Sequence, residues 1–180
     1  WLAYSARLAK GGLQQIVNRM VSLGYAVPGA VLAVGILVLL GQLDIAWLIS
    51  GSVVVLVYAY LTRFLSSSLQ TVEAGLSKIT PSMDASAMSL GSGRWELLRK
   101  IHLPLLRRSL LTAGLLVFVD VMKELPATLV LRPFNFDTLA VVTYQLASDE
   151  RLAEAAWPAL TIVLAGLLPV IILSRAMSKD

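Results

Sequence analysis

The sequence contains no cysteine and only one histidine, His102, among its 180 residues. Without cysteine, disulfide bonds and thiolate metal sites are excluded, and a single histidine cannot build a multi-histidine zinc site. The chain also has no Gly-x4-Gly-Lys-Ser/Thr phosphate-binding loop, so we do not expect it to hydrolyse ATP itself. We therefore expect no catalytic residues, no resident metal and no cofactor.

Charge is scarce as well. Charged residues make up 14% of the chain and hydrophobic residues 57%, with a mean hydropathy of +0.78, which is far more apolar than a typical soluble domain. Uncharged runs at 21–43, 45–62 and 155–174 are each long enough to cross a bilayer. These runs predict an all-α, polytopic transmembrane bundle in contact with lipid.

A fourth predicted span is less apolar. Residues 109–119 are uncharged, but a full span must also include Asp120, Lys123 and Glu124. Charges in a membrane helix are tolerated when they face protein or water, so we expect this helix to line a path. Asp120 and Glu124 are four residues apart and should share a helix face. There they could receive a cationic cargo, or they could only fix packing through Lys123 or Arg132.

The net charge of +4 raises the possibility of nucleic-acid binding, but the distribution of charge argues against it. The connection 63–108 holds seven basic and three acidic residues, whereas 120–154 holds six acidic and three basic ones. Positively charged connections lie on the cytoplasmic side. We expect both ends of the chain and the middle connection to be cytoplasmic, with four spans between them and no nucleic-acid partner.

The chain starts with Trp1 rather than Met, and no signal peptide is recognisable at its start. We therefore expect a fragment of a longer polypeptide, forming one membrane domain over 1–180, with further spans upstream.

Glycine and proline punctuate the first predicted span. Gly24, Gly29, Gly35 and Gly41 would let helices approach closely, and Pro28 should kink the helix. We favour packing over pore lining as the role of these residues. The second predicted span ends in Tyr58, Tyr60 and Arg63, which is typical of an aromatic belt with a cytoplasmic anchor.

The predicted cytoplasmic connection, 64–108, contains two short helices. One should begin after Thr80, with Met83, Ala87 and Leu90 on one face. The other should follow Gly91-Ser92-Gly93, with Trp95, Leu98 and Ile101 on one face and Arg94, Arg99 and Lys100 elsewhere; Pro104 should end it. This pattern indicates a docking element for another protein.

On the opposite side, 127–154 is expected to form a loop and an amphipathic helix, with a non-helical passage from Leu129 to Asp137 that contains Arg132. For these charged residues, ordinary ion pairing and a gating role are both open. The candidate path or outer-gate residues are Asp120, Lys123, Glu124, Pro126, Thr128, Arg132 and Asp137.

The middle connection resembles the motif of binding-protein-dependent ABC permeases: Glu-Ala-Ala, three residues, Gly, nine residues, Ile-x-Leu-Pro. The matching residues are Ala85-Ser86-Ala87, Gly91 and Ile101-His102-Leu103-Pro104. The acid of the family pattern is absent from its usual place, where Ala85 stands. Asp84, one position earlier, is the residue that could substitute for it. The resemblance implies that this segment couples to an ATPase.

Further segments look like those of ferric-iron permeases. They are Gly24-Tyr25-Ala26-Val27-Pro28-Gly29, Lys123-Glu124-Leu125-Pro126-Ala127-Thr128-Leu129 and the run from Leu131 to Ala140. The resemblance implies the C-terminal half of an inner-membrane importer for ferric iron. Its expected partners are a cytoplasmic ATPase dimer, a periplasmic substrate-binding protein and a second permease half or subunit. Thiamine, polyamine, sulfate and molybdate permeases share the architecture and remain alternative cargo classes.

Two other classes of protein were considered. An ion-coupled secondary transporter could also use Asp120 and Glu124, but it would have no need of a paired docking helix. A structural membrane anchor would explain neither the charged span nor the motif. The sequence favours the permease.

Overall fold

The computed structural model describes residues 3–4, 12–43 and 51–178 of the chain. Every regular element among them is helical, which confirms the predicted all-α class. The elements are α2 (Gly12–Ala26), α3 (Gly29–Gly41), α5 (Val53–Leu76), α6 (Pro81–Ser89), α7 (Arg94–Leu97), the π-helix η1 (Leu98–His102), α8 (Leu103–Met122), α9 (Pro126–Leu131), α10 (Leu139–Ser148) and α11 (Leu152–Ser178).

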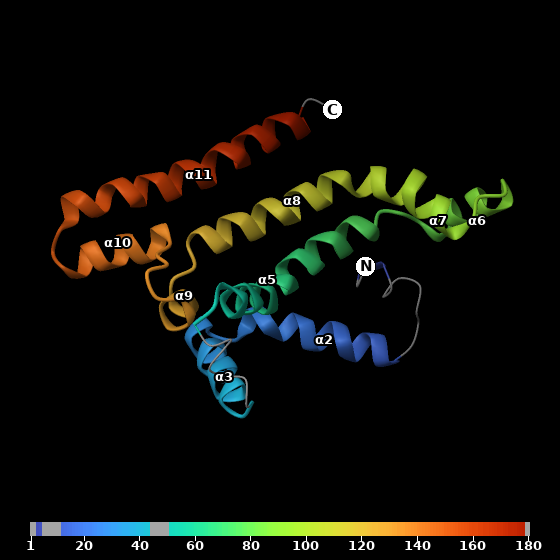
Figure 1. Ribbon diagram of the computed structural model, residues 1–180. Helices are drawn as coiled ribbons and strands as arrows, with labels where there is room; N and C mark the ends of the chain where they lie inside the picture. The colour runs from blue at the N-terminus through green and yellow to red at the C-terminus, as the bar shows by residue number, and fades with distance from the viewer. Residues whose placement is uncertain (1–2, 5–11, 44–50, 179–180) are drawn as a thin grey trace.

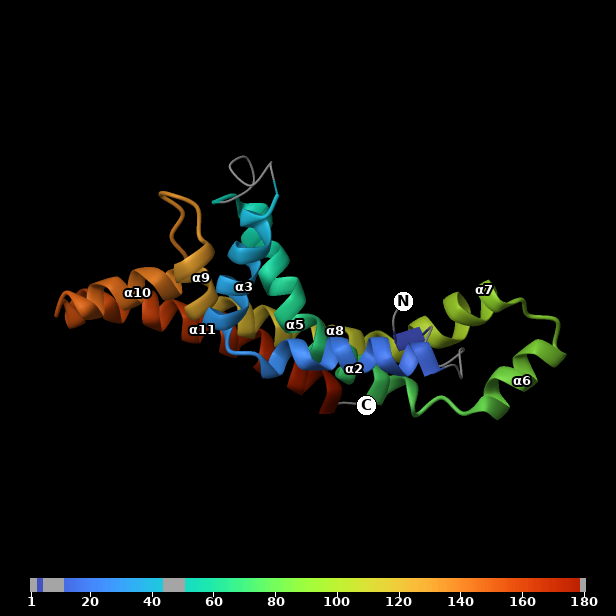
Figure 2. The same cartoon turned by 90° about the horizontal axis from the view of Figure 1, so that it is seen from below.

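Long helices run side by side in a bundle (Figures 1 and 2). Helix α5 packs against α2 and α8, and α11 packs against α8 and α10. Glycine permits the closest approaches. A Cβ at Gly24 would collide with the backbone carbonyl of Thr62, and one at Gly75 would collide with the Ser109 side chain. Two glycines of α3, Gly35 and Gly41, make no such contact with the described residues.

The first predicted span is broken rather than kinked. Helices α2 and α3 meet at an angle of 115°. Pro28 has φ −56° and ψ 137° and stands directly before Gly29, the first residue of α3. Proline has no backbone N–H and disfavours helical geometry in the residue before it, so the chain leaves the helix at Val27 and starts a new one. The interruption predicted at Pro28 is therefore present, but it is a complete break between two helices rather than a kink within one.

The second predicted span extends well past its expected end. Helix α5 continues to Leu76, because no glycine or proline interrupts residues 64–74. Arg63 therefore lies near the middle of α5 rather than at its end. The first part of 64–108 is therefore helix, and the interfacial position of Tyr58, Tyr60 and Arg63 stays a prediction. Residues 45–50 of the predicted span lie outside the described residues.

Pro104 does not end the second loop helix, contrary to prediction. Helix α7 passes through η1 directly into α8, and Pro104 stands in the first turn of α8. Within η1, the Leu103 N–H bonds to the carbonyl of Leu98, five residues back. Pro104 has no N–H to donate to the preceding turn, and the π turn directly before it is the place where the regular hydrogen-bond pattern of this continuous helix changes.

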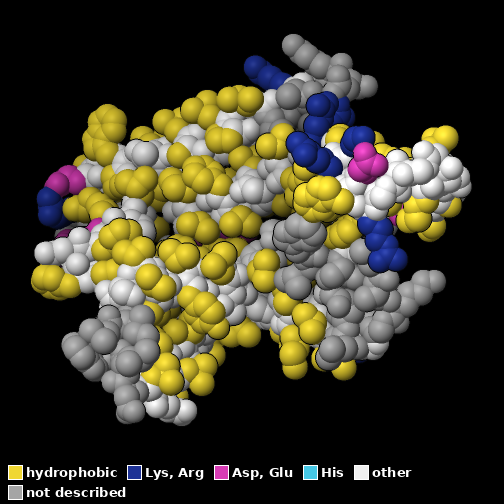
Figure 3. Space-filling model, turned by 45° about the vertical axis from the view of Figure 1, so that its right-hand side comes forward, with side chains coloured by type: hydrophobic (Ala, Val, Ile, Leu, Met, Phe, Trp, Pro, Cys, Tyr) yellow, Lys and Arg dark blue, Asp and Glu magenta, His cyan; other side chains and the backbone are white. Residues whose placement is uncertain are grey.

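The face shown in Figure 3 is largely apolar, and many large hydrophobic side chains of the described residues are exposed. Among the described residues, α5 and the 152–172 part of α11 are long and apolar enough to cross a membrane, and α2 with α3 would add a third span if the bent pair counts as one. Helix α8 is 20 residues long but contains Arg107, Arg108 and Asp120. The described ends of the chain point toward the α6–α7 end of the molecule, away from α9 and α10 (Figures 1 and 2).

Candidate functional site

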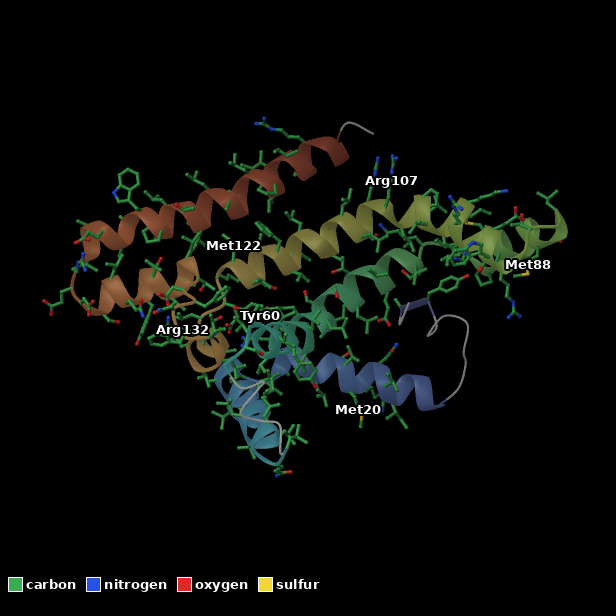
Figure 4. The ribbon with its side chains drawn as sticks, in the orientation of Figure 1. Met20, Tyr60, Met88, Arg107, Met122 and Arg132 are labelled. Carbon is green, nitrogen blue, oxygen red and sulfur yellow. The ribbon has the colours of Figure 1, made fainter. Side chains whose placement is uncertain are left out.

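Two regions contain the residues singled out by the sequence. The coupling segment, residues 81–104, lies at one end of the bundle, and the polar junction, formed by Gly29, Tyr60, Arg63, Glu124 and Thr128, lies toward the other. In Figure 4, Met88 marks the coupling segment and Tyr60 marks the polar junction.

The two loop helices begin where the sequence predicted. Thr80 and Gly93 are the N-cap residues of α6 and α7. Between the helices, Gly91 has φ +86°, the left-handed conformation that glycine adopts readily. The Gly91 N–H bonds to the Met88 carbonyl at 2.9 Å and the Ser92 N–H bonds to the Ala87 carbonyl at 3.1 Å. These two bonds form a Schellman cap, which fixes the direction in which the chain leaves α6.

Asp84 points inward rather than toward a partner surface. Its carboxylate accepts a hydrogen bond from His102 Nε2 at 2.7 Å, and the His102 side chain is 1% exposed. The ring of Tyr4 lies edge-on to the imidazole at 5.4 Å. Ala85, which occupies the place of the family acid, is exposed. The predicted coupling residue Asp84 is thus brought against His102, which was not among the predicted coupling residues.

The predicted apolar faces of the loop helices are only partly buried. In α6, Ala87 is buried, whereas Met83 and Leu90 are exposed. In the next helix Leu97 is buried, whereas Trp95 is exposed. Of the remaining motif residues, Ser86, Gly91, Leu103 and Pro104 are exposed and Ile101 is half-buried.

Basic side chains surround the coupling segment. Arg94, Arg99, Lys100 and Arg107 are exposed, and the Arg107 side chain points away from the bundle in Figure 4. Figure 3 shows Lys and Arg gathered at this end of the molecule. Lys100 Nζ pairs with Glu96 Oε1 at 2.8 Å, and this hydrogen bond holds the pKa of Glu96 below its usual value. This end therefore offers a basic surface with apolar side chains within it.

At the polar junction, Asp120 and Glu124 do not share a helix face, contrary to prediction. Helix α8 ends at Met122, and Lys123 is its C-cap residue. Asp120 pairs with Lys123 at 3.0 Å, and the Lys123 side chain is largely exposed. Glu124 lies beyond the end of the helix and turns into the protein, where it is 5% exposed. The two carboxylates therefore have separate environments and separate partners.

Glu124 caps the start of α9. Its Oε1 accepts from the Ala127 N–H at 3.1 Å, and its Oε2 accepts from the Thr128 N–H at 3.0 Å and from the Thr128 hydroxyl at 2.7 Å. The Tyr60 hydroxyl lies 2.6 Å from the Thr128 hydroxyl and donates to it, since the Thr128 proton is used by Glu124. A carboxylate at a helix N-terminus is stabilised by the free N–H groups there.

Arg63 completes the polar junction from the middle of α5. Its Nη1 lies 3.3 Å from Glu124 Oε1, and the two side chains are 22% and 2% exposed. Gly29 makes room for this pair. A Cβ at Gly29 would overlap Arg63 Nη1 and would lie 2.9 Å from Glu124 Oε1. The pair thus lies where the α2–α3 break and the α8–α9 break meet α5.

The remaining path candidates lie around α9. Because α9 is helical as far as Leu131, the prediction of a non-helical passage was wrong for residues 129–131. Pro126 begins the helix, and Arg132, just beyond its end, forms an ion pair with Asp137 across the loop. This is the ordinary ion pairing considered from the sequence, whereas Lys123 pairs with Asp120 rather than with Glu124. The structure brings Glu124 and Thr128 together and leaves Asp120 with Lys123 and Arg132 with Asp137 as separate pairs.

Sequence reasoning missed Arg63, Tyr60 and Gly29 as partners of Glu124. A usable signal was present, because Arg63 and Glu124 are opposite charges that each adjoin a long apolar run, and charges in membrane helices tend to pair. Among the described residues, no group of three or more His, Cys, Asp or Glu side chains could hold a metal ion. Both Glu124 oxygens are already used within the protein.

The sequence pattern of the family described as "Binding-protein-dependent transport system inner membrane component" matches residues 2–179. Among curated proteins, the chain is 30% identical over 163 residues to the Fe(3+)-transport system permease protein FbpB 2 of Haemophilus influenzae, covering 91% of this chain and 32% of that protein. It is 29% identical over 167 residues to PhnV of Salmonella typhimurium, which is named for 2-aminoethylphosphonate transport, covering 93% of this chain and 62% of that protein. The chain thus spans about a third of one relative and under two thirds of the other.

Proposed function

The chain belongs to the family of inner membrane components of binding-protein-dependent ABC transporters, and from this premise we propose that it forms part of the membrane pore of an importer for ferric iron. Ferric iron is proposed as the cargo because the chain is 30% identical, over 91% of its length, to a protein named for Fe(3+) transport. The family is one of transport permeases and not of enzymes, so the energy for transport comes from a separate subunit.

The coupling segment is the proposed contact with that subunit. It combines exposed apolar side chains on α6, such as Met83 and Leu90, with exposed basic residues on α7 and η1. The Schellman cap at Gly91 gives the segment a fixed shape. In the proposed orientation this end is cytoplasmic, as are both ends of the chain, and a dimer of ATPases docks there. A second permease half or subunit completes the pore.

The polar junction is the proposed outer gate. Both carboxylate oxygens of Glu124 are already occupied by hydrogen bonds from α9 and by the ion pair with Arg63. In the proposal Glu124 therefore joins α5 to the α8–α9 break and does not bind iron. Asp120 is 14% exposed and is held by Lys123 alone among the charged groups described around it. It is the carboxylate that a passing cation could reach. A periplasmic binding protein would deliver the cargo at this end.

A second cargo, 2-aminoethylphosphonate, is favoured by the similarity to PhnV. The test is uptake into proteoliposomes that hold the full-length permease and its ATPase, with the matching binding protein outside. ATP-dependent accumulation of ferric iron, without accumulation of 2-aminoethylphosphonate, is the expected result. Accumulation of 2-aminoethylphosphonate without ferric iron would establish 2-aminoethylphosphonate as the cargo. Uptake of either compound without ATP would contradict the proposal that the protein is part of an ATP-driven importer.

A further inference from the structure

We infer that the Asp84–His102 hydrogen bond is the link through which movement of α6 reaches α8, and that Asp84 acts as a positioning residue rather than as a docking acid. The inference rests on the proposed coupling function and assigns a role to a contact inside the coupling segment.

The bond is short and sheltered. Asp84 Oδ1 and His102 Nε2 are 2.7 Å apart, His102 is 1% exposed, and the Asp84 side chain is 18% exposed. Hydrogen bonds to a charged group are stronger than neutral ones, and exclusion of water strengthens them further. The two side chains are therefore expected to move together.

The Asp84–His102 hydrogen bond lies where it can transmit movement of α6 to α8. Figures 1 and 2 show α6 projecting from the end of the bundle, and Ala87 is its buried residue. His102 is the last residue of η1, directly before α8. The bond thus joins a weakly packed helix to the base of a long bundle helix, 18 residues further along the chain.

The imidazole has little else to orient it. Its Nδ1 is buried and has no hydrogen-bond partner in the described part of the chain. The edge of the Tyr4 ring restricts one side of the ring plane. A buried ring with one hydrogen bond takes its orientation from that bond, so displacement of Asp84 would be felt by His102 and by the first turn of α8.

The surface of α6 supports the same assignment. Ala85, at the place of the family acid, is exposed and uncharged, while the neighbouring acid turns inward. The exposed residues of α6 and its C-cap are all uncharged, namely Pro81, Ser82, Met83, Ala85, Ser86, Met88, Ser89 and Leu90. Docking through this side would bury apolar area, and Asp84 would act from behind it.

The experiment compares Asp84→Ala, His102→Ala and the double variant in the full-length permease assembled with its ATPase and binding protein. Two quantities are measured: ATPase retained on the purified complex, and stimulation of ATP hydrolysis by loaded binding protein. We expect each single variant to lose stimulation by about tenfold, the loss of one hydrogen bond to a charged group. The double variant should lose no more than either single variant, and ATPase retention should be unchanged.

Two further variants separate positioning from folding and docking. His102→Gln keeps a donor near the Nε2 position and should restore most of the stimulation. Ala85→Glu adds an acid to the exposed side of α6 without touching the pair, so an effect on docking should appear as reduced ATPase retention, whereas the Asp84 and His102 variants should leave retention unchanged.

Loss of ATPase from Asp84→Ala alone, or additive losses in the double variant, would overturn the inference and make Asp84 a docking residue. Failure of His102→Gln to restore stimulation would also overturn it. A native complex that shows no stimulation would overturn the proposed coupling function, and the inference with it, before any variant is compared.

Discussion

Arg63 Nη1 on α5 lies 3.3 Å from Glu124 Oε1, which comes from the break between α8 and α9, 61 residues away in sequence. The same carboxylate holds the first N–H groups of α9. The Glu124 side chain therefore accepts hydrogen bonds from the free N–H groups at the start of α9 and neutralises Arg63 within a largely apolar bundle. Removing one partner of a buried pair leaves an unpaired charge, which costs more than the pair contributes.

Glu124→Gln should destabilise the protein by about 3 kcal/mol, toward the lower end for a broken buried pair because Arg63 retains some exposure. The control is Asp120→Asn, whose partner Lys123 is largely exposed, so its change in stability should be well under 1 kcal/mol. The measurement is the thermal unfolding midpoint of the purified permease. Equal shifts for the two variants would contradict the assigned roles of the carboxylates.

The double variant Arg63→Gln with Glu124→Gln should be less destabilised than the sum of the two single variants, because neither charge is then left alone. A double-mutant cycle on unfolding free energies measures this coupling. Strict additivity would mean that the two side chains do not interact in the folded protein.

Gly29→Ala should disrupt the polar junction, since the added methyl group would overlap Arg63 Nη1 and lie 2.9 Å from Glu124 Oε1. Gly35→Ala is the matched control on the same helix, where a Cβ meets no described atom within 4 Å. Alanine favours a helix interior by about 1 kcal/mol over glycine, so this control should be neutral or stabilising. Both are scored by the thermal unfolding midpoint, and a stabilising Gly29→Ala would contradict the close packing.

Gly91→Val should weaken coupling while leaving basal ATP hydrolysis intact. A Cβ at Gly91 meets no described atom within 4 Å, but φ is +86°, and the left-handed conformation costs a β-branched residue about 1–2 kcal/mol or more. Gly91→Asn is the control, because asparagine tolerates this conformation. Stimulation of ATPase activity by loaded binding protein is the measurement. Valine performing as well as asparagine would show that the cap geometry is not needed.

Orientation can be tested by labelling, because the chain has no native cysteine. Leu90→Cys and Phe134→Cys place thiols at residues that are 87% and 94% exposed. In intact cells a membrane-impermeant reagent should label position 134 and not position 90, and inside-out vesicles should show the opposite. Reversed labelling would place the coupling segment outside and exclude its proposed contact with an ATPase.

Local features of the fold could be predicted from the sequence, and features that depend on distant partners could not. The starts of α6 and α7 follow from Thr80 and Gly93, and the left-handed Gly91 follows from the spacing of the loop helices. The break at Pro28 was expected as a kink. Its 115° angle depends on how α3 packs against α5 and α9, which no local pattern contains.

The polar junction was predicted incompletely for the same reason. Asp120 and Glu124 were expected on one face because helical periodicity was extended past Met122, where α8 ends. A local signal for the end of α8 was present, because Pro126 disfavours helical geometry in the residue before it. The turn of Glu124 toward Arg63 depends on α5, 61 residues away in sequence, so no pattern within one segment could predict it.

The π-helix η1 has a consequence for tolerance to insertions and deletions. A π turn closes its hydrogen bond over five residues instead of four, so η1 holds one surplus residue at the point where α7 joins α8. Deleting one residue from 98–102 would turn the π turn into an ordinary α turn, so α7 and α8 would keep nearly the same faces. Deleting one residue from the regular part of α8 would instead rotate everything before it by about 100° around the helix axis. The π turn is therefore a place in this helix where the loss of one residue should leave the direction of α6 largely unchanged.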